Sequence, residues 1–165
     1  MRVEQWMTTD PHTVEPHASV ARARALLKEH RIDQLPVTLS GRLVGIVTER
    51  DLRDAMGTMC VAAEAAGDPI PQRRSAEKIA IEAVMTAIAI TVEPDDTIER
   101  AAVLMRRERI GALPVVHRGE LRGIFTRTDV LRAYLALASY ERRAGINAPW
   151  ESPYSKLELP RQAQR

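Results

Sequence analysis

The feature that most constrains the fold is an internal repeat with a constant spacing of 78 residues. Between residues 3–55 and 81–133, roughly 22 of the 53 aligned pairs are identical, and the alignment needs no gap. The blocks that recur in order are Met7-Thr8 with Met85-Thr86, Thr13-Val14-Glu15-Pro16 with Thr91-Val92-Glu93-Pro94, and Leu35-Pro36-Val37 with Leu113-Pro114-Val115. A repeat of this kind predicts two copies of one supersecondary unit.

Each copy alone is expected to be only marginally stable. A unit of about 53 residues buries a smaller fraction of its surface than a larger domain does, so we expect the two copies to fold onto each other. The predicted boundaries are residues 1–56 for the first copy, 57–80 for a linker that starts as a helix extension, and 81–138 for the second copy. Residues 139–165 are predicted to form a basic, proline-containing, flexible tail.

Hydrophobic periodicity predicts the order β-α-β-β-α within each copy, which is an α/β (α+β) unit. In the first copy, Thr13-Val14 predicts a brief strand, and Ser19 is a candidate N-cap for a helix to about His30. In the second copy, Asp96 and Glu99 frame the corresponding helix start. The remaining predicted elements are hairpins over 35–37 with 43–47 and over 113–116 with 121–125, followed by helices to about residue 56 and about residue 138.

The composition disfavours several classes of function. The net charge is only +2 and aromatic residues make up 4% of the chain, so binding of nucleic acid is not expected. A single cysteine, Cys60, cannot form an internal disulfide and is typical of a reducing cytoplasm. No segment predicts a signal peptide or a membrane span. The four histidines lack metal-ligand spacing, and no nucleophile with a neighbouring base is visible, so the sequence predicts neither a metal site nor an enzyme.

A shared motif in the two copies carries the chemistry. Gly45 to Asp51 and Gly123 to Asp129 both read Gly, two apolar residues, Thr, two variable residues and Asp. Thr-x-x-Asp is typical of a capping box at a helix start, in which the two side chains satisfy backbone donors. The same helix start can also bind an anion, and a hydroxyl with a carboxylate can hold a phosphate or a sugar diol. Repetition of the motif with its neighbouring blocks favours a ligand site.

The four blocks together resemble a pair of CBS (cystathionine-β-synthase) domains, the Bateman module. The resemblance covers nearly all of residues 3–137. It implies two β-α-β-β-α motifs packed by pseudo-twofold symmetry into one module, commonly a homodimer. It also implies two clefts that bind adenosine-containing ligands such as AMP, ADP, ATP or S-adenosylmethionine. In the family, the Asp of the motif binds the ribose hydroxyls, the Thr assists, and the segment before Leu-Pro-Val meets the adenine edge.

Carried over residue by residue, the resemblance implies one nucleotide site in each copy. The first site would contain Thr13, Ile32, Gln34, Pro36, Thr48 and Asp51. The second would contain Thr91, Ile110, Ala112, Pro114, Thr126, Arg127 and Asp129. Beside the phosphates the second copy offers Arg127, whereas the first offers Glu49, which would repel an anion, next to Arg50. We therefore expect the second site to be preferred by a charged nucleotide.

Two functions follow from the sequence as leading hypotheses. The first is a stand-alone regulatory module that binds an adenine nucleotide, requires no other cofactor, and signals to an unidentified protein partner. The alternative is a constitutive dimerisation or scaffold module without a physiological ligand. Nucleic-acid binding through the basic tail and enzymatic action on the nucleotide rank below these, because the net charge is small and no activated nucleophile or metal clamp is visible.

Overall fold

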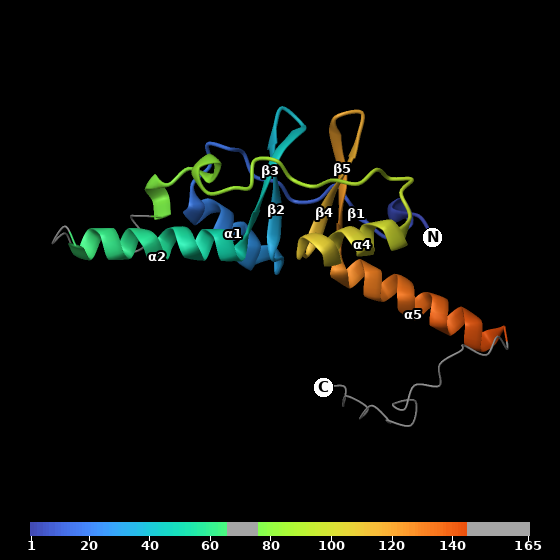
Figure 1. The fold of residues 1–165 in the computed structure, drawn as a ribbon. Coiled ribbons are helices and arrows are strands. Elements are labelled where there is room, and N and C mark those ends of the chain that lie inside the picture. Colours follow the sequence, from blue (N-terminus) through green and yellow to red (C-terminus); the bar gives the residue numbers. More distant parts are fainter. Residues whose placement is uncertain (66–75, 145–165) are drawn as a thin grey trace, which may run out of the picture.

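The computed structural model describes residues 1–65 and 76–144, and its elements follow the repeat (Figure 1). The first copy contains η1 (Val3–Gln5), β1 (Thr8–Thr9), α1 (Val20–His30), β2 (Gln34–Leu39), β3 (Arg42–Thr48) and α2 (Glu49–Ala65). The second contains η2 (Ile81–Ala83), α4 (Ile98–Glu108), β4 (Ala112–His117), β5 (Glu120–Thr126) and α5 (Arg127–Arg143). The predicted α+β class is confirmed, since each copy has a helix, a hairpin and a second helix.

The two hairpins have matching turns because the same backbone conformation recurs in both. Ser40 and Gly41 have φ values of 50° and 78°, and Arg118 and Gly119 have φ values of 53° and 82°. Two consecutive residues with positive φ are typical of the tight hairpin turn whose twist matches that of the strands. The turn fixes the pairing of β2 with β3 and of β4 with β5, which are both antiparallel.

The helices α1 and α4 also begin and end alike. The hydroxyls of Ser19 and Thr97 each accept a hydrogen bond of 3.2 Å from the backbone N–H three residues later. Each helix stops at an arginine in the left-handed conformation, Arg31 or Arg109. The predicted start of α4 at Asp96 is wrong, because the N-cap residue is Thr97. Asp96 instead accepts a 2.9 Å hydrogen bond from a backbone N–H of the preceding turn.

The predicted strand at Thr13-Val14 is wrong. Val14 makes one isolated parallel bridge with Val37, because Pro16 begins the turn into α1 and the segment leaves the sheet edge after a single residue. The short strand of the first copy lies earlier, in β1, which begins at Thr8 of the Met-Thr block. The second copy repeats the arrangement, with one isolated bridge between Val92 and Val115.

The leading segment of each copy pairs with the hairpin of the other copy. β1 runs antiparallel to β5, with Thr8 opposite Ile124. The corresponding residue Thr86 bridges Ile46 of β3, with reciprocal backbone hydrogen bonds of 2.9 and 3.1 Å. The two copies have therefore exchanged their leading segments, and the exchange obeys the 78-residue spacing.

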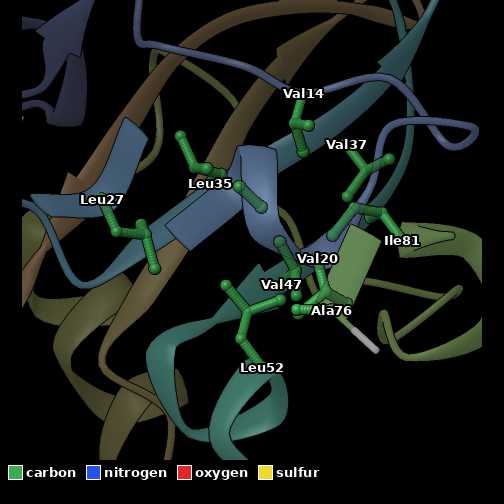
Figure 2. Packing of buried hydrophobic residues seen from close by; sticks show 10 residues of the cluster. Val14, Val20, Leu27, Leu35, Val37, Val47, Leu52, Ala76 and Ile81 are labelled. Carbon is green, nitrogen blue, oxygen red and sulfur yellow. The ribbon is translucent and has the colours of Figure 1, made fainter. Parts of the chain in front are cut away.

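The exchange continues into the two hydrophobic cores. Ile81 of η2 is fully buried in the core of the first copy, beside Val20 and Val37 (Figure 2). Val3 of η1 is fully buried in the core of the second copy, which also contains Phe125. Neither core is complete without an apolar side chain from the other copy, which is the physical reason that two marginal units form one module.

Direct sheet contact between the copies is slight. β3 and β5 are paired at one position, Arg42 opposite Glu120. From the sheet, α2 and α5 extend toward opposite ends of the molecule (Figure 1), and both are longer than their predicted ends at about residues 56 and 138. Within the described ranges, no helix has the length and apolar character needed to cross a membrane.

Candidate functional site

A cleft of about 780 Å³ lies between the two copies. One wall is formed where β3 runs into α2, and another where β5 runs into α5, so each copy contributes the first turn of a helix. Residues 109–112, at the entrance to β4, line the cleft as well. So does the exchanged segment 86–90, through Thr86, Ile88, Ala89 and Ile90. The cleft therefore depends on the relative position of the two copies.

About half of the predicted site residues line this cleft. They are Gln34, Thr48, Asp51, Ile110, Ala112, Thr126 and Arg127. The others lie outside its lining: Thr13 and Thr91 are exposed, Pro36 and Pro114 are fully buried within the hairpins, and Asp129 is buried. Ile32 lines a neighbouring groove of about 770 Å³ between α1 and α2, which shares Asp33 and Glu49 with the cleft. The structure thus joins parts of both predicted sites in one space.

Both Thr-x-x-Asp motifs form capping boxes. Asp51 Oδ2 accepts hydrogen bonds from the backbone N–H of Thr48, at 2.8 Å, and from its hydroxyl, at 2.7 Å. The Thr48 hydroxyl in turn accepts from the backbone N–H of Asp51 at 3.3 Å. Thr126 and Asp129 repeat this pattern within 0.1 Å. The carboxylate is thereby held with one oxygen at the helix start, and its orientation is set before a ligand arrives.

Charged side chains from both copies surround Asp51. The basic residues of the lining are Arg50, Arg53, Arg109 and Arg127, and the acidic ones are Asp33, Glu49 and Asp51. Glu49, which was expected to repel an anion, forms an ion pair of 3.1 Å with Arg53. Arg127, which was expected to serve the second site, lines the cleft that holds Asp51, and its Nε donates to the Ile110 carbonyl at 3.2 Å. The charges of the two copies therefore act on one ligand space.

Sequence reasoning missed the wall formed by residues 86–90. Ile88 in this wall is 90% exposed, an unusual position for a large apolar side chain, and Ile46 of β3 also lines the cleft. The segment carries no motif of its own. The available signal was the Met-Thr block just before it, since a repeated block outside the hairpins has to pack on something.

Among the described residues, no group of three or more His, Cys, Asp or Glu side chains is placed to hold a metal ion. His12 and His30 stack their rings with centroids 3.5 Å apart, but they lie outside the lining of the cleft. The side chains that line the cleft supply hydrogen-bonding groups, charges and apolar surface.

A sequence model of the CBS domain matches residues 3–58 and 81–136. Inosine-5'-monophosphate dehydrogenase of Korarchaeum cryptofilum is 37% identical over 130 residues, which make up 78% of this chain but 23% of that enzyme. The chain therefore corresponds to about a quarter of that relative. CBS domain-containing protein YhcV of Bacillus subtilis is 28% identical over 128 residues, and the match covers 81% of its length.

Solved CBS pairs share the fold. The structure of CBSX2 in complex with AMP matches with a TM-score of 0.68 and 30% identity, covering 83% of this chain and 98% of that one. The CBS domain pair of MJ0100, in complex with 5'-methylthioadenosine and S-adenosyl-L-methionine, matches with a TM-score of 0.65 and 27% identity, with the same two coverages of 83% and 98%. Both solved pairs are complexes with adenosine-containing ligands.

Proposed function

The chain belongs to the CBS domain family as a tandem pair of CBS motifs, and we propose that it is a regulatory module that binds an adenine nucleotide in the cleft between them. The observation that carries this proposal is the joint lining of the cleft by both motifs. It combines a fixed carboxylate at Asp51, exposed apolar side chains at Ile88 and Ile90, and arginines from both motifs. The solved relatives with AMP and with S-adenosylmethionine support the same ligand class.

Each part of an adenine nucleotide has a matching group in the cleft. Asp51 has its capping bonds on Oδ2, which leaves Oδ1 to accept from the ribose hydroxyls. Ile46, Ile88 and Ile110 offer apolar surface to the faces of the base. Arg109 and Arg127 offer planar guanidinium groups to phosphate oxygens. A phosphorylated compound fits these arginines better than the sulfonium cation of S-adenosylmethionine does.

Binding across two motifs provides a means of signalling. The ligand would contact β3 and α2 of one motif and β5 and α5 of the other, whereas the direct pairing of these strands is limited to one position. A ligand that binds one relative arrangement of the motifs more tightly shifts the population toward it. We propose that α2 or α5, which extend beyond the sheet, transmit that shift to a protein partner in the cytoplasm.

The direct test is thermal unfolding in the presence of AMP, ADP, ATP, S-adenosylmethionine, NAD and guanine nucleotides. A ligand at about 100 times its dissociation constant adds roughly 2.7 kcal/mol to the free energy of unfolding. For a chain of this size, that corresponds to a rise of about 5–10 °C in Tm. A rise with adenine compounds alone supports the proposal. If no compound changes the Tm, the chain is not a nucleotide sensor.

Replacing Arg127 with Gln should weaken the binding of phosphorylated ligands selectively. Loss of one charge-assisted contact costs about 1.5–3 kcal/mol, so the affinity for ATP or AMP should fall about tenfold or more. Adenosine, which has no phosphate, should bind with unchanged affinity. Isothermal titration calorimetry measures both. The matched control is Arg106→Gln, because Arg106 is an exposed arginine of α4 outside the cleft. Equal losses for adenosine and ATP would remove Arg127 from the phosphate site.

One observation supports a dimerisation role alongside ligand binding. α5 carries an exposed apolar stripe of Leu131 (62% exposed), Tyr134 (44%) and Leu135 (61%), on a helix that extends beyond the sheet (Figure 1). Twofold dimers bring the same surface of both subunits together, and a single-helix stripe can pair with itself. We propose that a second copy of the chain covers this stripe and forms the homodimer that the family resemblance implies.

The double substitution of Leu131 and Leu135 with Glu should convert the dimer to a monomer. Four carboxylates would then meet in an apolar contact, which costs far more than the contact provides. Light scattering coupled to size exclusion should give the mass of one chain for the variant and of two chains for the wild type. Val103→Glu, at an exposed valine of α4, is the control and should remain dimeric. A monomeric wild type, or a variant that stays dimeric, contradicts this assignment of the interface.

A further inference from the structure

The two Thr-x-x-Asp carboxylates differ in what surrounds them. Asp129 is 4% exposed, and its Oδ1, the oxygen not used by the capping box, accepts a 3.2 Å hydrogen bond from Arg132 Nη1. The position that corresponds to Arg132 in the first motif is occupied by Asp54, an acid. The capping boxes match, so the difference lies in the oxygen that would face a ribose.

Ribose binding at Asp129 therefore has a cost that binding at Asp51 lacks. The hydroxyls would have to replace a charge-assisted contact from a guanidinium with bonds from neutral donors, which are about half as strong. At Asp51, the capping bonds are on Oδ2 and no such contact has to be broken in the described structure. Because the Arg132 side chain is 62% exposed, solvent screens the ion pair, and Arg132 can be removed without opening the core.

A second difference lies in the exchanged segments. The cleft that holds Asp51 is lined by Ile88 and by Arg53. On the other side of the pseudo-twofold axis, the 78-residue spacing places Asp10 where Ile88 lies here. It likewise places Leu131 where Arg53 lies here. Beside Asp129, the carboxylate of Asp10 thus takes the place of the apolar side chain that would cover a base, and the apolar side chain of Leu131 takes the place of a cation. Both replacements disfavour an anionic nucleotide.

We infer that the chain binds a single nucleotide, in the cleft that contains Asp51, and that Arg132 together with Asp10 excludes a nucleotide from Asp129. This inference rests on the proposed function and adds its stoichiometry and specificity-determining residues. It reverses the preference for the second site that the sequence had suggested. The tandem pair then has one sensing cleft, and the Asp129 motif keeps a structural role as a capping box.

The experiment is calorimetric titration of the full chain with AMP and, separately, with ATP. Wild type should bind one equivalent per chain. Asp51→Asn should lose about 10- to 100-fold in affinity, because a charged acceptor for the ribose is removed. Arg132→Ala, a variant at an exposed side chain, should keep the first site unchanged. The double variant Asp10→Ile with Arg132→Asp, which copies the residues found around Asp51, should gain a second binding event.

The outcomes are separable. Two equivalents in the wild type, or one equivalent that survives Asp51→Asn and disappears in Asp129→Asn, would overturn the inference while leaving nucleotide binding intact. A double variant that still binds one equivalent would overturn the role of Arg132 and Asp10. Absence of binding to the wild type by both AMP and ATP would refute the proposed function, and the inference with it. Unfolding curves of each variant distinguish lost binding from lost folding.

Discussion

Asp51→Asn is expected to reduce sharply the rise in Tm that an adenine nucleotide produces, while lowering the Tm of the free protein by only about 2–4 °C. An amide keeps an oxygen that can accept the backbone N–H of Thr48, so the capping box survives at a cost of about 1 kcal/mol. The nucleotide instead loses the charged acceptor for its ribose hydroxyls. A stabilisation of about 2.7 kcal/mol at 100 times the wild-type dissociation constant should shrink to about 1.4 kcal/mol if the affinity falls tenfold, and to about 0.4 kcal/mol if it falls 100-fold.

The matched control is Asp129→Asn, the same change at the corresponding residue of the other motif. It removes an acid whose Oδ1 pairs with Arg132, so the free protein should lose stability while the nucleotide-induced rise in Tm remains. Differential scanning fluorimetry at several nucleotide concentrations separates the two effects. If both variants lose the rise equally, the two carboxylates act on ligands alike and Asp51 has no special role.

The repeat made much of the fold predictable. A constant spacing of 78 residues required both hairpins to have the same register, and the positive φ values at Gly41 and Gly119 recur at the same spacing. Ser19 was found as a helix cap because a hydroxyl before an apolar-periodic run has few other uses. The equivalent cap at Thr97 was missed, since neighbouring Asp96 has the same propensity and only the backbone geometry separates them.

The exchange of leading segments could not be read from the repeat. The 78-residue pattern is the same whether the leading segment packs on its own copy or on the other copy. Only the three-dimensional path of the chain distinguishes the two arrangements. The consequence for the site is direct. Thr48 and Asp51 were found by their motif, but the wall at residues 86–90 belongs to the other copy and reaches them only because Thr86 pairs with Ile46.

The glycine of each motif links this exchange to stability. A Cβ added at Gly45 would lie 2.8 Å from both the Met85 sulfur and the Thr86 carbonyl oxygen. At Gly123 it would lie 2.7 Å from the Thr8 carbonyl oxygen and 2.8 Å from the Met7 sulfur. The sulfur sits on a flexible side chain, but the carbonyl belongs to a hydrogen-bonded backbone. In each copy, therefore, the repeated glycine is in close contact with the Met-Thr block of the other copy.

Gly45→Ala and Gly123→Ala should each lower the free energy of unfolding by about 2–3 kcal/mol, because the exchanged segment is pushed off the strand it pairs with. Gly57→Ala is the control, since Gly57 lies within α2 with no atom within 4 Å of an added Cβ. There, alanine should raise stability by roughly 0.8–1 kcal/mol through its helix propensity. Chemical denaturation measures all three, and unchanged midpoints for the two strand variants would contradict the close contact.

The two strand variants should differ sharply in nucleotide binding despite similar losses of stability. Gly45→Ala displaces Thr86 and with it the wall at residues 86–90, so the cleft that holds Asp51 loses its apolar cover and its affinity. Gly123→Ala displaces Thr8 on the opposite side of the pseudo-twofold axis and should leave the dissociation constant unchanged. Titration at a temperature where both variants are folded isolates this difference. Equal affinities would mean that the exchanged segment contributes to folding alone, and the cleft would then have to recognise its ligand through the helix starts and arginines.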